Sequence, residues 1–255
     1  MRRAIWVEWR KVRRSPVTLV TTGLLVVPMP LLVLGFLAVA EKGGVGAASV
    51  KAQALVVDDG WPGYLFLAGQ LVSVTMFIGP GVVAAWVFGR EFADRTFPSL
   101  FALPVSRRSI AAAKLVVLIG WGALVSLLVV LAVGLIGVLA DVGPEPASDV
   151  LPGLGRLLAA CLLTVLLATT LGLVASVGRG HLPAIGVMIL LVMAAQVSVL
   201  FGTGGWFPYA APGLMAVAGG EGVPLLAPAQ VLLVPVTGAV AGWLTVRWWG
   251  RAEVS

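Results

Sequence analysis

The sequence predicts an all-α, polytopic membrane protein with six transmembrane helices. Of its 255 residues, 60% are hydrophobic and only 11% are charged, whereas soluble domains average about 25% charged residues. At about 20 residues per span plus loops, this length allows about five to seven helices. We expect a single transmembrane domain over residues 1–255, with spans in the uncharged apolar runs 17–40, 65–88, 115–140, 157–177, 183–201 and 228–246.

The first apolar run also has features of a secretory signal. A basic start precedes it, and Ala38-Val39-Ala40 resembles a small-residue cleavage site. The run from Val17 to Ala40 has 24 residues, however, and the apolar region of a signal peptide has about 7–15. We therefore interpret it as a retained span.

The basic residues indicate the orientation of the spans. Of the 17 lysines and arginines, 14 lie in segments 1–16, 89–114, 178–182 and 247–255. Basic loops stay on the cytoplasmic side, so we expect both termini and the 89–114 loop in the cytoplasm of a cell membrane. Because these cations are juxtamembrane, they match anionic membrane lipid as a partner and not nucleic acid.

Residues 1–16 predict an N-terminal amphipathic interfacial helix. Ile5, Trp9 and Val12 share one helix face, whereas most of the basic residues lie elsewhere. Tryptophans at headgroup depth and cations towards phosphate are typical of such helices, and Pro16 ends this one. An anchor that fixes topology and a functional role both remain open.

Seven charges lie in residues 88–114, between two uncharged runs. Glu91 and Arg95 are four residues apart, as are Arg90 and Asp94, so both pairs are expected to form along a helix that continues the second span. Charges here indicate either a solvated loop or a contact surface for a partner outside the membrane.

A short apolar helix is expected after this extension. Thr96-Phe97-Pro98 interrupts the chain, and proline is tolerated in the first turn of a new helix, which runs from Pro98 to about Leu103. Ser106 is placed to cap the third span. The alternative is an apolar helix that lies on the lipid surface.

Residues 202–228 are too apolar for a free outer loop and too rich in glycine and proline to cross the membrane; their one charge is Glu221. A re-entrant segment between spans five and six is expected, because broken backbone at membrane depth is tolerated where protein covers it. Pro212 would begin a short helix and Gly219-Gly220 would end it. An interfacial hairpin is the alternative.

The motifs of common catalytic sites are missing. There is no P-loop, the single histidine is His181, and Cys161 is the single cysteine, so we expect no catalytic, metal-binding or cofactor-binding residues in this chain. No ionisable residue lies within the six predicted spans, which argues against a carrier driven by protons or sodium.

Two sets of span residues are candidates for function. Gly79, Pro80 and Gly81 predict a hinge in the second span, since proline removes a helix hydrogen bond. The polar residues that could line a substrate path, or simply support helix packing, are Gln70, Ser73, Thr75, Thr169 and Gln196.

One motif resembles a known family. Leu103-Pro104-Val105-Ser106-Arg107, with Lys114 after it and Glu91 to Thr96 before it, lies between the second and third of six spans. This arrangement resembles the permease subunits of type-2 ABC exporters. Members of that family often have a glycine immediately before the threonine, and here Arg95 occupies that position.

The resemblance implies how such a chain works. Two permeases, identical or paralogous, would meet in a bacterial plasma membrane, each docked on a cytoplasmic ABC ATPase subunit that binds ATP and Mg²⁺. Residues 89–103 would form the coupling helix seated in a cleft of the ATPase, and the hinge would pass its motion into the bundle. The coupling residues would be Glu91, Asp94, Arg95, Pro98, Leu100, Phe101, Leu103 and Arg107.

The expected function is export of a hydrophobic or amphipathic substrate, such as a drug, a peptide antibiotic or a lipid-like molecule, without enzymatic activity in this chain. Two alternatives remain. A sensory or immunity subunit would bind its ligand without moving it, and a facilitator would pass a small solute without ATP.

Overall fold

The computed structural model describes residues 1–42, 46–47, 50, 60–102, 104–218, 223 and 225–252, and all regular structure in them is helical. The main helices are α1 (Arg2–Arg14), α2 (Pro16–Val26), α3 (Pro28–Lys42), α5 (Gly60–Ala93), α6 (Arg107–Leu139), α7 (Ala147–Leu167), α8 (Thr169–Val177), α9 (His181–Leu200), α10 (Ala211–Ala216) and α11 (Pro228–Arg251). Two short 3-10 helices are η1 (Pro98–Ala102) and η2 (Gly204–Trp206).

Six helical segments in the described part of the chain are long and apolar enough to cross a membrane, which confirms the predicted class. Each overlaps one of the predicted runs. The first consists of α2 and α3, which meet at Val27 just before Pro28, and the fourth consists of α7 and α8, which meet at Ala168. The six segments are Pro16–Ala40, Gly60–Ala93, Arg107–Leu139, Ala147–Val177, His181–Leu200 and Pro228–Arg251.

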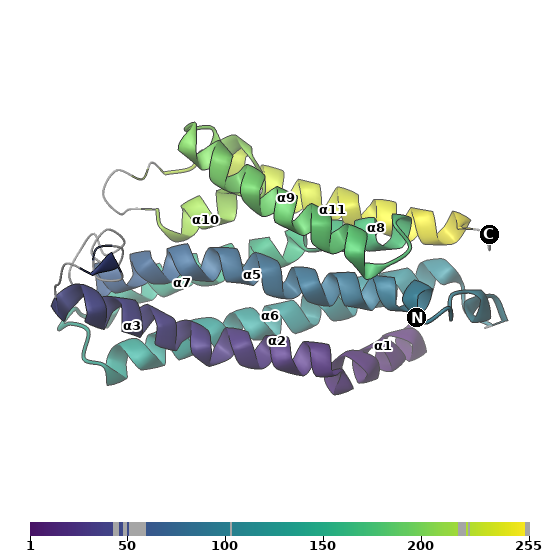
Figure 1. The fold of residues 1–255 in the computed structure, drawn as a ribbon, viewed down its shortest axis with the longest axis horizontal. Helices are drawn as coiled ribbons and strands as arrows, with labels where there is room; N and C mark the ends of the chain where they lie inside the picture. The colour runs from purple at the N-terminus through teal and green to yellow at the C-terminus, as the bar shows by residue number, and fades with distance from the viewer. Residues whose placement is uncertain are drawn as a thin grey trace.

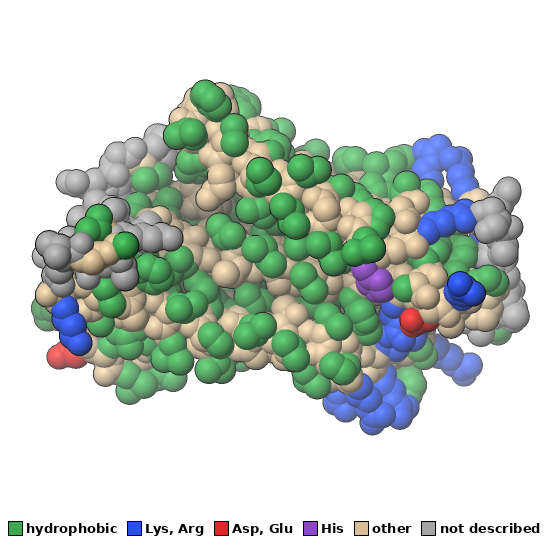
Figure 2. Space-filling view, viewed as in Figure 1, with side chains coloured by type: hydrophobic (Ala, Val, Ile, Leu, Met, Phe, Trp, Pro, Cys, Tyr) green, Lys and Arg blue, Asp and Glu red, His purple; other side chains and the backbone are tan. Residues whose placement is uncertain are grey.

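The helices form one elongated bundle with both chain ends at the same end of it (Figure 1). Lysine and arginine side chains gather at this end on the visible face (Figure 2); we call it the basic end. Helix α10 and the connection between α6 and α7 lie at the opposite, far end (Figure 1). This placement agrees with the uneven distribution of basic residues in the sequence.

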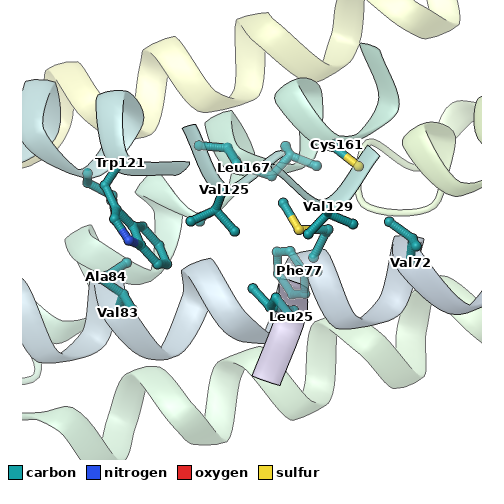
Figure 3. Close-up of a cluster of buried hydrophobic side chains, with 14 of the residues drawn as sticks. Leu25, Val72, Phe77, Val83, Ala84, Trp121, Val125, Val129, Cys161 and Leu167 are labelled. Carbon is teal, nitrogen blue, oxygen red and sulfur yellow. The ribbon is translucent and has the colours of Figure 1, made fainter. Parts of the chain in front are cut away.

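Helix α5 is the centre of the bundle, since it contacts α2, α3 and α6 to α10. Its side chains meet those of α6, α7 and α2 in a continuous apolar core (Figure 3). Cys161 is buried in this core with its leucine and valine neighbours. By contrast, only 11% of the α9 span is buried, so α9 forms much of the outer apolar surface.

The predicted hinge lies in the middle of α5, which continues through it as one helix. A Cβ atom added at Gly79 would lie 2.7 Å from Leu25 Cδ1, and one added at Gly81 would lie 2.6 Å from Leu171 Cδ1. Both glycines therefore allow other helices to pack closely on α5. A bending role for Gly79, Pro80 and Gly81 stays a prediction.

Pro212 lies in the first turn of α10, as expected, and α10 packs on α7 and α5. The helix ends at Ala216, before the expected end at Gly219-Gly220, which lies outside the described residues, as does Glu221. Whether this region re-enters a membrane stays a prediction.

Gly122 of α6 packs against α7, and we expect Gly122→Ala to destabilise the bundle. Its added Cβ would overlap Cγ1 of Val165, whereas a Cβ at Gly120 on the same helix would meet nothing within 4 Å. Overpacking of this kind costs about 1–3 kcal/mol. The thermal unfolding midpoint in detergent should fall for Gly122→Ala and stay level or rise for the control Gly120→Ala; equal midpoints would contradict this account of the contact.

Candidate functional site

A fully buried lysine lies at the basic end, where α1, α5 and α6 meet. Lys114 is 0% exposed. Its Nζ lies 2.6 Å from Glu91 Oε1 of α5 and 3.1 Å from Glu8 Oε2 of α1, and it donates a further hydrogen bond of 2.8 Å to the Val87 carbonyl oxygen. One ammonium group therefore joins three helices.

Lys11 of α1 completes this group. Its Nζ lies 2.6 Å from Glu8 Oε1 and 3.6 Å from Glu91 Oε1, and its side chain is 32% exposed. We call Glu8, Lys11, Glu91 and Lys114 the charge cluster. Two carboxylates and two ammonium groups balance in charge, which is the condition under which such groups tolerate burial.

The charge cluster favours the ionised form of the Glu8 carboxyl group. Burial by itself raises the pKa of its carboxyl group, but the charges of Lys114 and Lys11 and their hydrogen bonds outweigh this effect and hold the pKa below its ordinary value. Glu8 is therefore ionised under ordinary conditions and holds α1 on the bundle.

The predicted apolar face of α1 is only partly buried in the bundle. Glu8 and Val12 are buried, whereas Trp9 is 37% exposed and Trp6 is 60% exposed. Of the predicted apolar face, Val12 is therefore buried and Trp9 is exposed, and the ion pair with Lys114 turns Glu8 inward. The one signal in the sequence is a single acid on a basic helix. A place for the tryptophans at headgroup depth stays a prediction.

The ion pairs expected along the end of α5 are not formed among the described residues. Helix α5 ends at Ala93, so Arg95 lies beyond it and does not share a helix face with Glu91. The guanidinium of Arg90 lies over the Trp86 ring, 4.7 Å from its centroid, and not on Asp94. Glu91 is 4% exposed, so it acts inside the protein and not on its surface.

An aromatic cluster fixes the chain that follows α5. It consists of Phe88, Phe92, Phe97, Trp248 and Trp249. Phe97 stacks on Phe92 with centroids 4.5 Å apart and lies edge-on to Trp249 at 5.5 Å. Phe97 is 6% exposed and Trp249 is fully buried. Such pairs contribute about 0.5–1.5 kcal/mol each beyond their area of contact.

Trp249 connects this aromatic cluster to two other features. Its Nε1 donates a hydrogen bond of 2.8 Å to Ser176 Oγ of α8, and Lys114 Nζ lies 5.7 Å from its ring centroid. The aromatic cluster and the charge cluster are thus in contact. Phe97 and the two tryptophans of α11 are not among the individual site residues predicted from the sequence.

Between the two clusters and η1, the chain makes a tight turn. The backbone N–H groups of Thr96 and Phe97 both donate to the Glu91 carbonyl oxygen, at 2.9 Å each. Arg95 has φ of 55°, in the left-handed region that glycine adopts without steric cost. In the family that the motif resembles, this position is often glycine.

The turn presents a short exposed segment at the basic end. Asp94, Arg95 and Pro98 are exposed, and Leu100 is half-buried against the core. Phe101 lies in η1 by its backbone, and Leu103 lies outside the described residues.

The chain then enters α6 as expected. Ser106 is the N-cap, and its side chain accepts a hydrogen bond of 3.2 Å from the Ser109 N–H. Arg107 donates to the Ala252 carbonyl oxygen, which ties the start of α6 to the end of α11. The 3-10 helix Pro98–Ala102 is therefore held at both ends.

A second candidate region is a cavity of about 500 Å³ among α5, α7, α9 and α10. Three of the predicted path residues, Gln70, Ser73 and Gln196, line it. The other two do not: Thr75 bonds back to its own helix, and Thr169 Oγ1 donates to the Gly238 carbonyl oxygen of α11 at 2.9 Å. The described residues contain no group of three or more His, Cys, Asp or Glu side chains placed to hold a metal ion.

Comparison with known proteins assigns the family. The model of the family described as "ABC-2 family transporter protein" matches residues 4–195, from α1 into α9. The chain belongs to this family. It is also 25% identical over 149 residues to the bacitracin transport permease protein BCRB of Bacillus licheniformis, covering 57% of this chain and 69% of the relative.

The family match covers the candidate site and agrees with the helical architecture. An ABC-2 family transporter protein is a multi-pass membrane permease, and the six helical segments agree with that. The matched range includes all four charge-cluster residues and η1.

Proposed function

We propose that this chain is the membrane subunit of an ATP-driven exporter, with its basic end in the cytoplasm and η1 docked on an ATPase subunit. The observation that carries this proposal is the anchoring of the Asp94–Ala102 segment. The two clusters hold it on α1, α6 and α11, while Asp94, Arg95 and Pro98 remain exposed. A segment that packs firmly on the helices on one side and is exposed on the other can transmit a displacement from a partner to the helices.

Coupling needs both of these properties. A rigid-body movement reaches the spans only if the contact segment does not fold away from them. Here a displacement of η1 acts on Phe97 and Glu91, and through them on α11, α6 and α1. In this proposal, ATP and Mg²⁺ bind the partner ATPase, and two permease copies or paralogues form the pathway.

The cavity and the relative support a proposal for the substrate class. The cavity of about 500 Å³ is mainly apolar, and its polar lining residues are Gln70, Ser73, Thr164, Gln196 and Tyr209. Such sites suit amphipathic molecules. The relative is a bacitracin transport permease by name. We therefore propose an amphipathic substrate, such as a peptide antibiotic.

The first experiment is an affinity purification of the tagged chain from its native membranes in mild detergent. Phe101→Asp is the test variant, because an apolar side chain on η1 would be an interface anchor. We expect an ATPase subunit to co-purify with the native chain and to be reduced at least about tenfold by the variant, as for an interface hot spot. Leu225→Asp is the matched control, since Leu225 is an 80% exposed apolar residue at the far end.

Transport is tested on the purified complex in proteoliposomes with a labelled amphipathic peptide. Movement of the peptide that requires hydrolysable ATP supports the exporter. A complex that hydrolyses ATP in response to the peptide without moving it would replace the proposal with a sensory subunit. Peptide flux without any bound ATPase would replace it with a facilitator.

A further inference from the structure

An acidic side chain at the far end lies between two cavities that the coupling mechanism does not use. One, of about 670 Å³, is a groove between α6 and α7; the other, of about 250 Å³, lies beside α5 and α10. Glu145, Trp61 and Val150 line both. The two cavities therefore adjoin at these three residues.

The larger cavity has the dimensions of a binding groove for one acyl chain. It follows α6 from Leu127 to Val138, about 16 Å of helix at 1.5 Å per residue. That is about half of the ~30 Å hydrocarbon thickness of a bilayer, or one leaflet. Its walls carry exposed apolar side chains, among them Leu131, Leu135 and Leu151 at 59%, 59% and 62% exposure, so it opens on the surface that faces lipid.

The end of the groove is acidic. Asp141 and Glu145 line it, and no lysine or arginine does among the described residues. Glu145 Oε2 is buried and has no hydrogen-bond partner in the described part of the chain. An unpaired buried carboxylate oxygen is costly, and it is satisfied by a ligand that donates a charged hydrogen bond.

We propose that this groove binds a membrane lipid with an amine headgroup, in the leaflet remote from the two chain termini. One acyl chain lies between α6 and α7, and the headgroup ammonium binds Glu145 beside Trp61. A carboxylate next to an aromatic ring is suited to an ammonium group. A lipid with an anionic headgroup is disfavoured, because it would bring its charge towards the two carboxylates of the groove, whereas the cation Arg156 lines only the smaller cavity.

The test uses the purified full chain in nanodiscs that contain equal amounts of phosphatidylethanolamine and phosphatidylglycerol. Lipid retained after mild detergent extraction is counted by native mass spectrometry. We expect phosphatidylethanolamine to be retained in preference, and Glu145→Gln to reduce that preference at least about tenfold, since hydrogen bonds to charged groups contribute about 1.5–3 kcal/mol. Asp94→Asn removes a carboxylate at the basic end and should leave the preference unchanged.

A second variant tests the groove apart from the headgroup. Leu131→Trp places a larger side chain in the groove from an exposed position and should reduce retention of both lipids at least about tenfold, with an unchanged unfolding midpoint. The proposal is overturned if neither lipid is retained by the native chain. It is equally overturned if Glu145→Gln keeps the preference, or if Leu131→Trp retains lipid as the native chain does.

Discussion

Replacement of Lys114 by methionine is expected to destabilise the bundle by about 3–5 kcal/mol, the cost of breaking a buried ion pair from one side. Methionine fills a similar volume but leaves Glu8 and Glu91 facing each other, and the remaining cation, Lys11, is 32% exposed. The thermal unfolding midpoint in detergent should fall by on the order of 10 °C. Stimulation of the partner ATPase should fall with it, since α1 loses its hold on α5.

Two controls separate charge from packing at this site. Lys11→Met removes a cation from the same cluster but from its exposed edge, so a loss of about 1 kcal/mol or less is expected. The triple variant Glu8→Gln, Glu91→Gln, Lys114→Met removes the buried charges together and should recover most of the midpoint, because neutral replacements of buried ion pairs are often tolerated. If the Lys114→Met variant has the same thermal unfolding midpoint as the native chain, the charge cluster does not hold the three helices together.

Replacement of Phe97 by alanine is expected to cost about 3–5 kcal/mol, as for other buried phenylalanines. Phe97 is 6% exposed and packs on Phe92 and Trp249. Its loss detaches the Asp94–Ala102 segment from α11. We expect faster proteolysis within that segment and, if it is the coupling element, loss of ATPase stimulation even where the ATPase still binds.

Phe97→Leu is the matched control, because it keeps most of the apolar volume at a cost of about 1.5 kcal/mol or less. Proteolysis and ATPase stimulation should stay near those of the native chain. If Phe97→Ala leaves the segment protected while Phe101→Asp releases the ATPase, then η1 is a docking surface that does not depend on the aromatic cluster. That result would separate binding from transmission.

Parts of the candidate site were predictable because they depend on neighbours in the chain. Ser106 as the cap of the third span follows from a serine before an apolar run, and the short helix after the break follows from Pro98. Glu91 was identified as a site residue but placed with the wrong partner, since the i,i+4 rule applies only within a continuous helix. The helix ends at Ala93, which made that rule inapplicable.

Other parts required the fold. Glu8 and Lys114 are 106 positions apart in the chain, and Phe97, which follows α5, meets Trp249 of α11. Nothing in the local sequence pairs these residues. The same holds for the candidate path: Gln70, Ser73 and Gln196 share one cavity, whereas Thr75 and Thr169 do not line it.

From the amino-acid sequence we could predict the class of this protein, its six apolar helical segments and the concentration of basic residues at one end. These follow from local properties, because about 20 consecutive apolar residues match the thickness of a bilayer wherever they occur. The packed fold was needed to see which face of α1 turns inward, which charges are buried together and which cavities form. Those outcomes depend on the balance between burial and charge pairing across distant helices, and that balance exists only once the helices are packed.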